Sequence, residues 1–597
     1  MATVVLIWIY VIATTYLTGL AFLKFVTSLD CMQVQKGRAG YKKYAPHYRE
    51  SYIIAGIVVN TVYAQLFSLI SGVGLAANML LIAVCAVIAV YYRDELKEDC
   101  GELLRILFAR REGKYYLLVF LIMAYGASHG IMHYDSDLYH AQAIHWIENY
   151  GVVKGLGNLH VRLAYNSSSF ALSALYSFSF LTGRSFHCMA GFFALLLAWK
   201  CLDLKDIVRR GQPILSDFAR IMAIYYLFTI YDEMVAPASD YFLSTIVFYI
   251  FIQWLDMNVR HIRSYLPYIM LALLGVYAVT IKLSAAPILL LSAIPIYQLF
   301  SNSDKKKKKA FGFSVLMAIV IVMPFIIRNV IISGWLVYPV TGIDLFKVIW
   351  KIPKGVAQYD AKEIRTFGRG YNDVAAFADV PFKEWIVNWF NSIHGFNKIM
   401  IILDMISIVI YIGCIVYFFV TAAAENSKTS GKVLKLKNRS MVKYADFLTL
   451  SGTMIACLIF WLFSAPLIRY GEVYVCLTFA IIIGRLLIKA YNTLDSEGSL
   501  AKVILRVSLV LFAVWFVYKA VNVVKYDYPR FNSDNLLVQQ DYGDYEVDTF
   551  KVGNTVFYYP TEGDKVGYKP FPSSTMDMSE KMIMIGSGIK DGFMSIP

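Results

Sequence analysis

Two aspartates stand two positions apart at the end of an apolar run, in the stretch MHYDSDLYHAQAIHWIENYG that begins at Met132. Carboxylates are costly in hydrocarbon, and those near a membrane boundary are candidates for function. Asp135 and Asp137 could act as a general base or bind a cation. In a purely structural role, Asp135 would cap a helix and Asp137 would favour its N-terminus. That role needs only one aspartate, so we predict a functional site here.

The residues behind the aspartates bear on metal binding. Asp137 and His140 are three apart on an expected helix and could share a metal ion, whereas His140 and His145 are five apart and do not share a face well. A histidine-based site is therefore less favoured, although Glu148 follows closely. A divalent cation, Mg²⁺ or Mn²⁺, held by Asp135, Asp137 and a substrate phosphate is the one cofactor that this stretch leaves open.

Further polar residues are expected on the same side of the membrane. The segment YDEMVAPASDYF supplies Asp232, Glu233 and Asp240, of which Asp240 begins an apolar run. Snorkelling to the interface could explain each nearby cation singly. Together, however, arginines that bind phosphate bidentately beside a carboxylate base indicate chemistry on a lipid phosphate. The expected substrate-binding residues are Tyr139, His140, Arg162, Asp240, Lys282, Arg328, Asn329, Arg469 and Tyr470.

Composition indicates the class of protein that positions these residues. Of 597 residues, 58% are hydrophobic and 16% are charged, whereas soluble domains carry about 25% charged residues. Several apolar runs reach the roughly 20 residues that cross a bilayer as helix. We therefore predict an all-α polytopic membrane protein. The fourteen expected spans lie near residues 3–26, 52–71, 75–92, 115–132, 186–203, 218–232, 237–256, 265–281, 284–300, 311–332, 398–421, 445–463, 473–490 and 503–521.

The distribution of charge predicts the orientation. The net charge is +14, but the basic residues cluster in short loops between apolar runs, as in SDKKKKKA, so we expect no nucleic-acid partner. The basic loops 27–51, 93–114 and 424–443 should be cytoplasmic. By parity, Asp135 then lies outside, together with the loop 333–397.

The segment SSSFALSALYSFSFLTG at 167–183 tests this topology. If it spanned, the basic loops downstream would change sides, so we expect an amphipathic helix on the outer surface.

Three regions follow from this topology. Residues 1–114 form three accessory spans and a cytoplasmic amphipathic segment, and 115–521 form the core with outer loops 133–185 and 333–397. Residues 522–597 form a small extracytoplasmic appendage with strand-like pieces DTFKVG and NTVFYYP.

The core resembles the GT-C superfamily of membrane glycosyltransferases. Asp135, Tyr139 and the helix running to Gly151 are similar to that superfamily's first outer loop, where an acidic motif precedes a tyrosine and a helix ending in glycine. The eleven spans expected from residue 115 onward suit a GT-C core. The stretches GNLHVRLAYNSSSF, IKLSAAP, IRNVIISGWLVYP and GDKVGYKPFP resemble bacterial membrane proteins linked to surface polysaccharide synthesis, over most of residues 115–597.

The resemblance implies an inverting glycosyltransferase with a polyprenyl-phosphate-linked sugar donor and a glycan, lipid or protein acceptor. It also implies a site on the extracytoplasmic face of a bacterial cytoplasmic membrane, with an aspartate as catalytic base. Ser136 stands where Asp-Glu members have Glu, and Asp137 fits the Asp-x-Asp form, so either Asp135 or Asp137 could be the base. Arg328 and Arg469 would stabilise the leaving lipid phosphate.

Two other functions are compatible with the sequence. A polysaccharide polymerase or ligase would rely on outer arginines, for which Arg328, Arg365 and Arg369 are available. A flippase or transporter needs polar residues deep in the bundle. Asn60 and Asp404 are the main residues of that kind in the expected spans.

Overall fold

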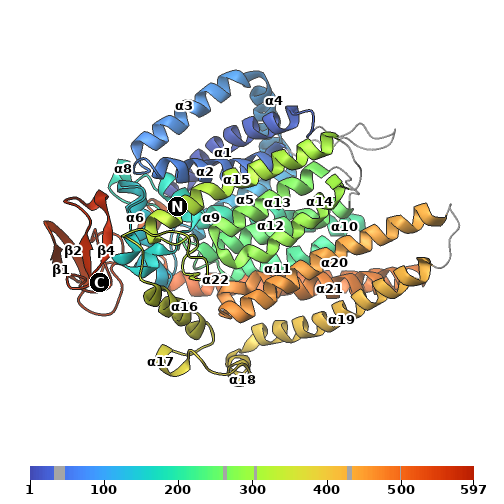
Figure 1. Ribbon diagram of the computed structural model, residues 1–597. Helices are drawn as coiled ribbons and strands as arrows, with labels where there is room; N and C mark the ends of the chain where they lie inside the picture. The colour runs from blue at the N-terminus through green and yellow to red at the C-terminus, as the bar shows by residue number, and fades with distance from the viewer. Residues whose placement is uncertain (33–47, 260–264, 301–304, 427–432, 498, 597) are drawn as a thin grey trace.

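The computed structural model describes residues 1–32, 48–259, 265–300, 305–426, 433–497 and 499–596. Long helices form an elongated bundle, with a small region of β-strands at one end (Figure 1). Both chain termini lie at that end, where the Thr3 amide donates a hydrogen bond to the Leu537 carbonyl at 3.1 Å. We call the end with the β-strands and the two termini the site end, because it also contains Asp135, and we call the opposite end the far end.

Eight helices among the described residues are long and apolar enough to cross a membrane. A pair bent by 92° could make a ninth span: α3 (Leu75–Tyr91) with α4 (Arg93–Leu104) and the π-helical turn Arg105–Ala109. The eight are α1 (Ala2–Ser28), α2 (Tyr48–Ser68), the 3₁₀ segment Leu283–Ser292 with α14 (Ala293–Phe300), α15 (Lys305–Ser333), α19 (Gly395–Asn426), α20 (Val433–Ser464), α21 (Ile468–Glu497) and α22 (Leu500–Asp527).

Shorter or more polar helices occupy the other expected spans. They are α5 (Arg111–Gly126), α9 (Met189–Cys201), α11 (Leu215–Thr229), α12 (Ser239–Val259) and α13 (Tyr265–Ile281). The prediction of an all-α membrane protein is therefore confirmed, and the number of fourteen spans stays a prediction.

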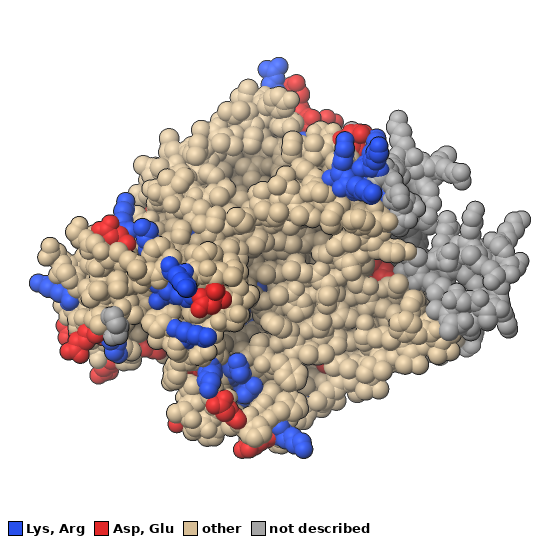
Figure 2. Space-filling view, viewed as in Figure 1, with Lys and Arg blue, Asp and Glu red and all other residues tan. Residues whose placement is uncertain are grey.

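The surface agrees with a membrane environment. Figure 2 shows a broad, almost uncharged belt between charged side chains at two ends of the molecule. At the far end, α15 begins with five lysines, Lys305 to Lys309. α4 (Arg93–Leu104) turns away from α3 and has no buried residue. Most side chains of the basic loops 27–51 and 424–443 lie outside the described residues.

The prediction that residues 167–183 form an amphipathic helix on the outer surface was wrong about the surface position. The segment forms α7 (Ser168–Leu175), followed by the short α8 (Ser179–Thr182), and every residue of α7 is buried. Its serines bond inside the protein: Ser167 Oγ donates to the Ile281 carbonyl at 2.8 Å, and Thr280 Oγ1 bonds to Ser168 Oγ at 2.9 Å. The serines that suggested an amphipathic helix at the surface therefore anchor a buried helix by hydrogen bonds inside the protein. Eight residues span only about 12 Å, too little to cross a bilayer.

The site end is built from loops and short elements. The loop after α5 contains one turn of π-helix, Ser136–His140, followed by α6 (Ala141–Asn149). The large loop after α15 contains α16 (Lys354–Gly368), α17 (Val374–Phe377) and α18 (Phe382–Ser392). The short helix α10 (Asp206–Arg210) precedes α11 at the far end (Figure 1).

The tail contains the expected strands. β1 (Val547–Val552) and β2 (Thr555–Pro560) form an antiparallel hairpin, and β3 (Met582–Met584) pairs with β4 (Phe593–Ser595). Gly553 turns the hairpin with a φ of 60°, a conformation that glycine adopts without strain.

Two glycines bring α1 and α2 into close contact, as is common between helices in membranes. A Cβ at Gly56 would collide with the Thr15 carbonyl, and one at Gly19 with the Tyr52 carbonyl. We expect Gly56→Ala to destabilise the protein by about 1–3 kcal/mol because the backbones must separate. Thermal unfolding in detergent measures this. Gly312→Ala on α15, where a Cβ meets nothing within 4 Å, is the control and should be neutral or slightly stabilising. Equal effects of the two changes would contradict the prediction.

Candidate active site

Asp135 lies between two arginines. Arg469 Nη2 donates to Asp135 Oδ2 at 2.9 Å, and Arg162 Nη1 lies 3.9 Å from Oδ1. Burial opposes the charged form, yet His140 and Arg469 hold the pKa of Asp135 below its usual value. Burial also lowers the pKa of His140 to about 3, so at pH 7 the guanidinium groups supply the positive charge. The Asp135 carboxylate is therefore ionised at neutral pH and able to accept a proton.

The ion pair continues into a network of alternating charges. Arg469 Nε lies 3.6 Å from Asp240 Oδ2, and Asp240 also accepts a hydrogen bond from Lys282 Nζ. The same Nζ lies 3.8 Å from the centre of the Tyr470 ring. We call Arg162, Asp135, Arg469, Asp240, Lys282 and Tyr470 the charged network; all six were expected site residues.

Helix ends bring the network together. Asp240 lies in the first turn of α12, Lys282 directly follows α13, and Arg469 lies in the first turn of α21. Each side chain follows or precedes an apolar helix, so the charges meet where the hydrocarbon of a membrane would end. Asp135 joins them from the position just before the π-helical turn Ser136–His140.

Arg469 has donors to spare. Within the part of the chain that the structure describes, its buried Nε and Nη1 atoms find no hydrogen-bond acceptor. A buried donor without a partner costs about 1–3 kcal/mol. An anionic oxygen bound beside Arg469 would recover that cost, which makes this guanidinium a natural phosphate ligand.

The rings of Tyr139 and His140 pack in the protein interior next to Asp135. The Tyr139 ring centre lies 4.4 Å from that of His140 and 5.8 Å from that of Tyr165. His140 Nδ1 lies 3.3 Å from Ser136 Oγ and the residue is buried. The two residues therefore shape the site, with His140 neutral and internally bonded.

Asp137 faces away from the charged network and binds the C-terminal tail. Its Oδ1 accepts from the Gly543 amide at 3.0 Å, and its Oδ2 accepts from the Tyr545 hydroxyl at 2.9 Å. Its carbonyl accepts from the amides of Val566 and Gly567. The structure thus separates the two aspartates that the sequence left equivalent.

The polar residues of α6 also bind the tail. His145 lies between the rings of Tyr568 and Phe571, each with its centre 4.0 Å away. Glu148 accepts from the Tyr568 hydroxyl at 2.5 Å and from Ser185 Oγ at 2.7 Å. The neighbourhood of polar groups that resembled a catalytic cluster is therefore in large part a docking surface for the tail.

Arg328 and Asn329 lie outside the charged network. Arg328 is buried, its Nε donates to Asn166 Oδ1 at 3.0 Å, and its Nη1 donates to Ser68 Oγ. Asn329 Nδ2 lies 3.3 Å from the Leu336 carbonyl. A cavity of about 520 Å³ in the following loop, lined by Trp335 and its neighbours, does not include Asp135.

Sequence reasoning missed Glu363. It lies on α16 and is 3.8 Å from Arg162 Nη2, so that Arg162 joins two carboxylates. One turn earlier, buried Asp360 accepts from the Tyr165 hydroxyl at 2.6 Å, and burial raises the pKa of Asp360. Neither acid follows an apolar run, so hydropathy gave no signal; only the spacing of the two, three residues apart on one helix face, marks them in the sequence.

The donor set does not fit the metal ion that the sequence left open. The Asp135 carboxylate faces Arg469 and Arg162, whose charges repel a cation, and both Asp137 oxygens are bonded to the tail. Across the described residues, no group of three or more His, Cys, Asp or Glu side chains could hold a metal ion.

Fold and site define a class: an all-α membrane protein with a charged network at one end of its helix bundle. Within that class, the chain belongs to the family described as Domain of unknown function (DUF8201), which matches residues 1–476. The match includes the N-terminal helices and all six residues of the charged network, and it ends within α21. No curated protein matches the chain.

The docking of the tail should depend on pH through His145. Its pKa is lowered to about 4 when docked, mainly by burial, from 6.5 when exposed. Docking therefore favours the neutral form of His145. The free energy of docking should become less favourable as pH falls below 6.5, by about 2 kcal/mol at pH 5. Hydrogen exchange of residues 543–571, corrected for intrinsic rates, measures this.

His145→Gln is the matched control, since glutamine donates to the Tyr568 carbonyl without titrating. Burial raises the pKa of Glu148, which opposes the trend, so the difference between wild type and variant isolates the histidine. The same pH profile in both proteins would refute the role of His145.

Proposed function

We propose that this protein is an inverting glycosyltransferase of GT-C type. It would transfer a sugar from a polyprenyl-phosphate-linked donor to an acceptor at the extracytoplasmic face of a bacterial cytoplasmic membrane. The observation that carries the proposal is the ionised Asp135 held between Arg162 and Arg469 at the ends of apolar helices. If the apolar helices span a bilayer, this arrangement brings a base and cations able to bind phosphate to the depth where a lipid phosphate would emerge.

Asp135 acts as the general base in this proposal. It removes the proton of an acceptor hydroxyl while that oxygen attacks the anomeric carbon of the sugar. The new bond joins the acceptor oxygen to that carbon, and the bond from the carbon to the phosphate oxygen breaks. The anomeric configuration inverts because there is one displacement.

The cations of the network act on the leaving group. Polyprenyl phosphate departs with a developing negative charge, and the spare donors of Arg469 are available to it. Lys282, held by Asp240 beside the Tyr470 ring, adds a second positive charge. The prenyl chain stays in the bilayer beside the helices whose ends carry these residues.

A polysaccharide polymerase or ligase is the second candidate. Arg328 favours it, because this buried guanidinium bonds to the neutral Asn166 and Ser68 and could bind an anionic glycan lipid. Arg369 stacks over Trp385 at 4.4 Å in the outer loop. Transport is less supported, since Asn60 bonds to Tyr176 and Asp404 to the Phe479 amide, in separate parts of the bundle.

The first test is Asp135→Asn. Loss of the base should lower transfer about 10²- to 10⁴-fold. The matched variant Asp137→Asn, which keeps the acceptor for the Gly543 amide, should lower it less than tenfold. The measurement is sugar transfer and release of polyprenyl phosphate in proteoliposomes, with a panel of polyprenyl-phosphate sugars and cell-envelope acceptors.

Undiminished transfer by folded Asp135→Asn protein would refute the assignment of the base. Undiminished transfer by the Asp135→Asn, Asp137→Asn double variant would refute the proposal as a whole. A loss in the variants of Arg328, Arg365 and Arg369 with Asp135→Asn still active would favour the polymerase.

Arg469→Lys tests the phosphate ligand. Lysine keeps the charge and removes the planar fork, so kcat/KM for the lipid donor should fall about 10²-fold. Arg530→Lys is the control because Arg530 pairs with Asp232 at 3.0 Å outside the charged network, and its kinetics should stay unchanged. Steady-state kinetics with varied donor measures both. Equal kinetics for Arg469→Lys and wild type would remove Arg469 from the mechanism.

A further inference from the structure

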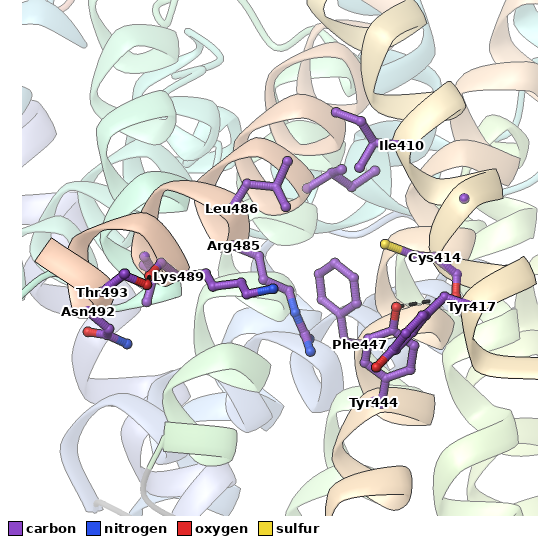
Figure 3. A pocket seen from close by; sticks show the side chains of 13 residues that line it. Ile410, Cys414, Tyr417, Tyr444, Phe447, Arg485, Leu486, Lys489, Asn492 and Thr493 are labelled. Carbon is purple, nitrogen blue, oxygen red and sulfur yellow. Dashed lines mark hydrogen bonds between the residues drawn. The ribbon is translucent and has the colours of Figure 1, made fainter. Parts of the chain in front are cut away.

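A cavity of about 920 Å³ lies between α19, α20 and α21. Arg485 and Lys489 of α21 and Tyr444 and Phe447 of α20 line it, and Figure 3 shows the side chains of Arg485 and Lys489 extending into it. None of the residues of the charged network lines the cavity.

The cavity lies toward the far end. Arg485 follows Arg469 by 16 residues on α21, about 24 Å along a helix, and Lys489 follows it by 20, about 30 Å. The hydrocarbon core of a bilayer is roughly 30 Å thick. With Arg469 at one membrane surface, Arg485 and Lys489 therefore reach the head-group level of the opposite leaflet.

Among the residues that the structure describes, the two cations lack acidic partners. Arg485 and Lys489 are four residues apart and share one face of α21. The Arg485 guanidinium lies 3.9 Å from the centre of the Phe447 ring and 5.1 Å from that of Tyr444. Throughout the described ranges no carboxylate pairs with either cation. Rings hold the guanidinium in place and leave its donors for an anion.

One side of the cavity is apolar. Ile410, Ile482 and Leu486 line it, and Figure 3 places Ile410 and Leu486 on the side away from Asn492 and Thr493. On α19 the neighbouring side chains of Val409 and Ile412 are exposed, as expected for a face against lipid chains. The cavity thus has a cationic part and an apolar part, which together complement a molecule with an anionic head group and an apolar chain.

We propose that this cavity binds an anionic phospholipid of the leaflet opposite the candidate active site. The lipid phosphate bonds to Arg485 and Lys489, and an acyl chain lies against Ile410, Ile482 and Leu486. The charge selects an anionic head group over a zwitterionic one. A soluble anion would not need the apolar lining. The inference does not depend on the proposed transferase activity.

The test is lipid binding to the purified full-length protein, measured by native mass spectrometry. Phosphatidylglycerol should bind more tightly than phosphatidylcholine with the same chains. Arg485→Gln with Lys489→Gln should weaken phosphatidylglycerol binding about 30-fold, the factor for two charges near a lipid head group. Lys502→Gln with Arg506→Gln removes two exposed cations from α22 as a matched control and should have no effect.

A second measurement uses the wild-type protein, so it does not depend on the folding of a variant. Cys414 lines the cavity and is half-buried. Phosphatidylglycerol should slow its alkylation by N-ethylmaleimide, read by peptide mapping, more than phosphatidylcholine does. Equal protection by both lipids, or an equal loss of binding in both charge variants, would overturn the proposal. So would equal protection by glycerol phosphate without acyl chains, which would indicate a soluble anion.

Discussion

The ion pair between Asp135 and Arg469 joins residues 334 positions apart in the chain. Partly buried charges are stable only when they are paired, and removing one partner leaves the other uncompensated. Arg469 also faces Asp240, which holds Lys282, so the ends of α12, α13 and α21 must converge on the loop after α5. The same requirement that holds these helix ends together gathers the acid and the cations that catalysis would use.

One short loop serves two purposes. Asp135 turns toward the charged network, while Asp137 and, farther along, His145 and Glu148 bind the tail. The tail thereby covers α6 and fixes the backbone on which Asp135 stands, since Asp137 is bonded through both its side chain and its carbonyl. If Asp135 is the proposed base, this gives it a rigid support although it lies on a loop.

α21 connects the two ends of the protein. Its first turn carries Arg469 in the charged network, and its later turns carry Arg485 and Lys489, which line the cavity between α19, α20 and α21. The helix length between them matches the thickness of a bilayer, so one helix carries cations at the levels of both membrane surfaces. An anionic lipid at the far end would fix the depth of α21 in the membrane and with it the depth of Arg469.

Hydropathy and charge in the sequence determined the class of protein, because apolar length is a local property that needs no knowledge of neighbours. They also predicted that Asp135, Arg162, Asp240, Lys282 and Arg469 lie on one side of the membrane, since Arg162 falls in the first outer loop and the other four lie near the ends of apolar runs. Only the tertiary structure decided which of these residues pair, that Asp137 and His145 serve the tail, that Arg328 and Asn329 bond elsewhere, and that α7 is buried. Those facts depend on contacts between segments far apart in the chain. The sequence of one segment contains no periodic signal that says which other helix packs beside it.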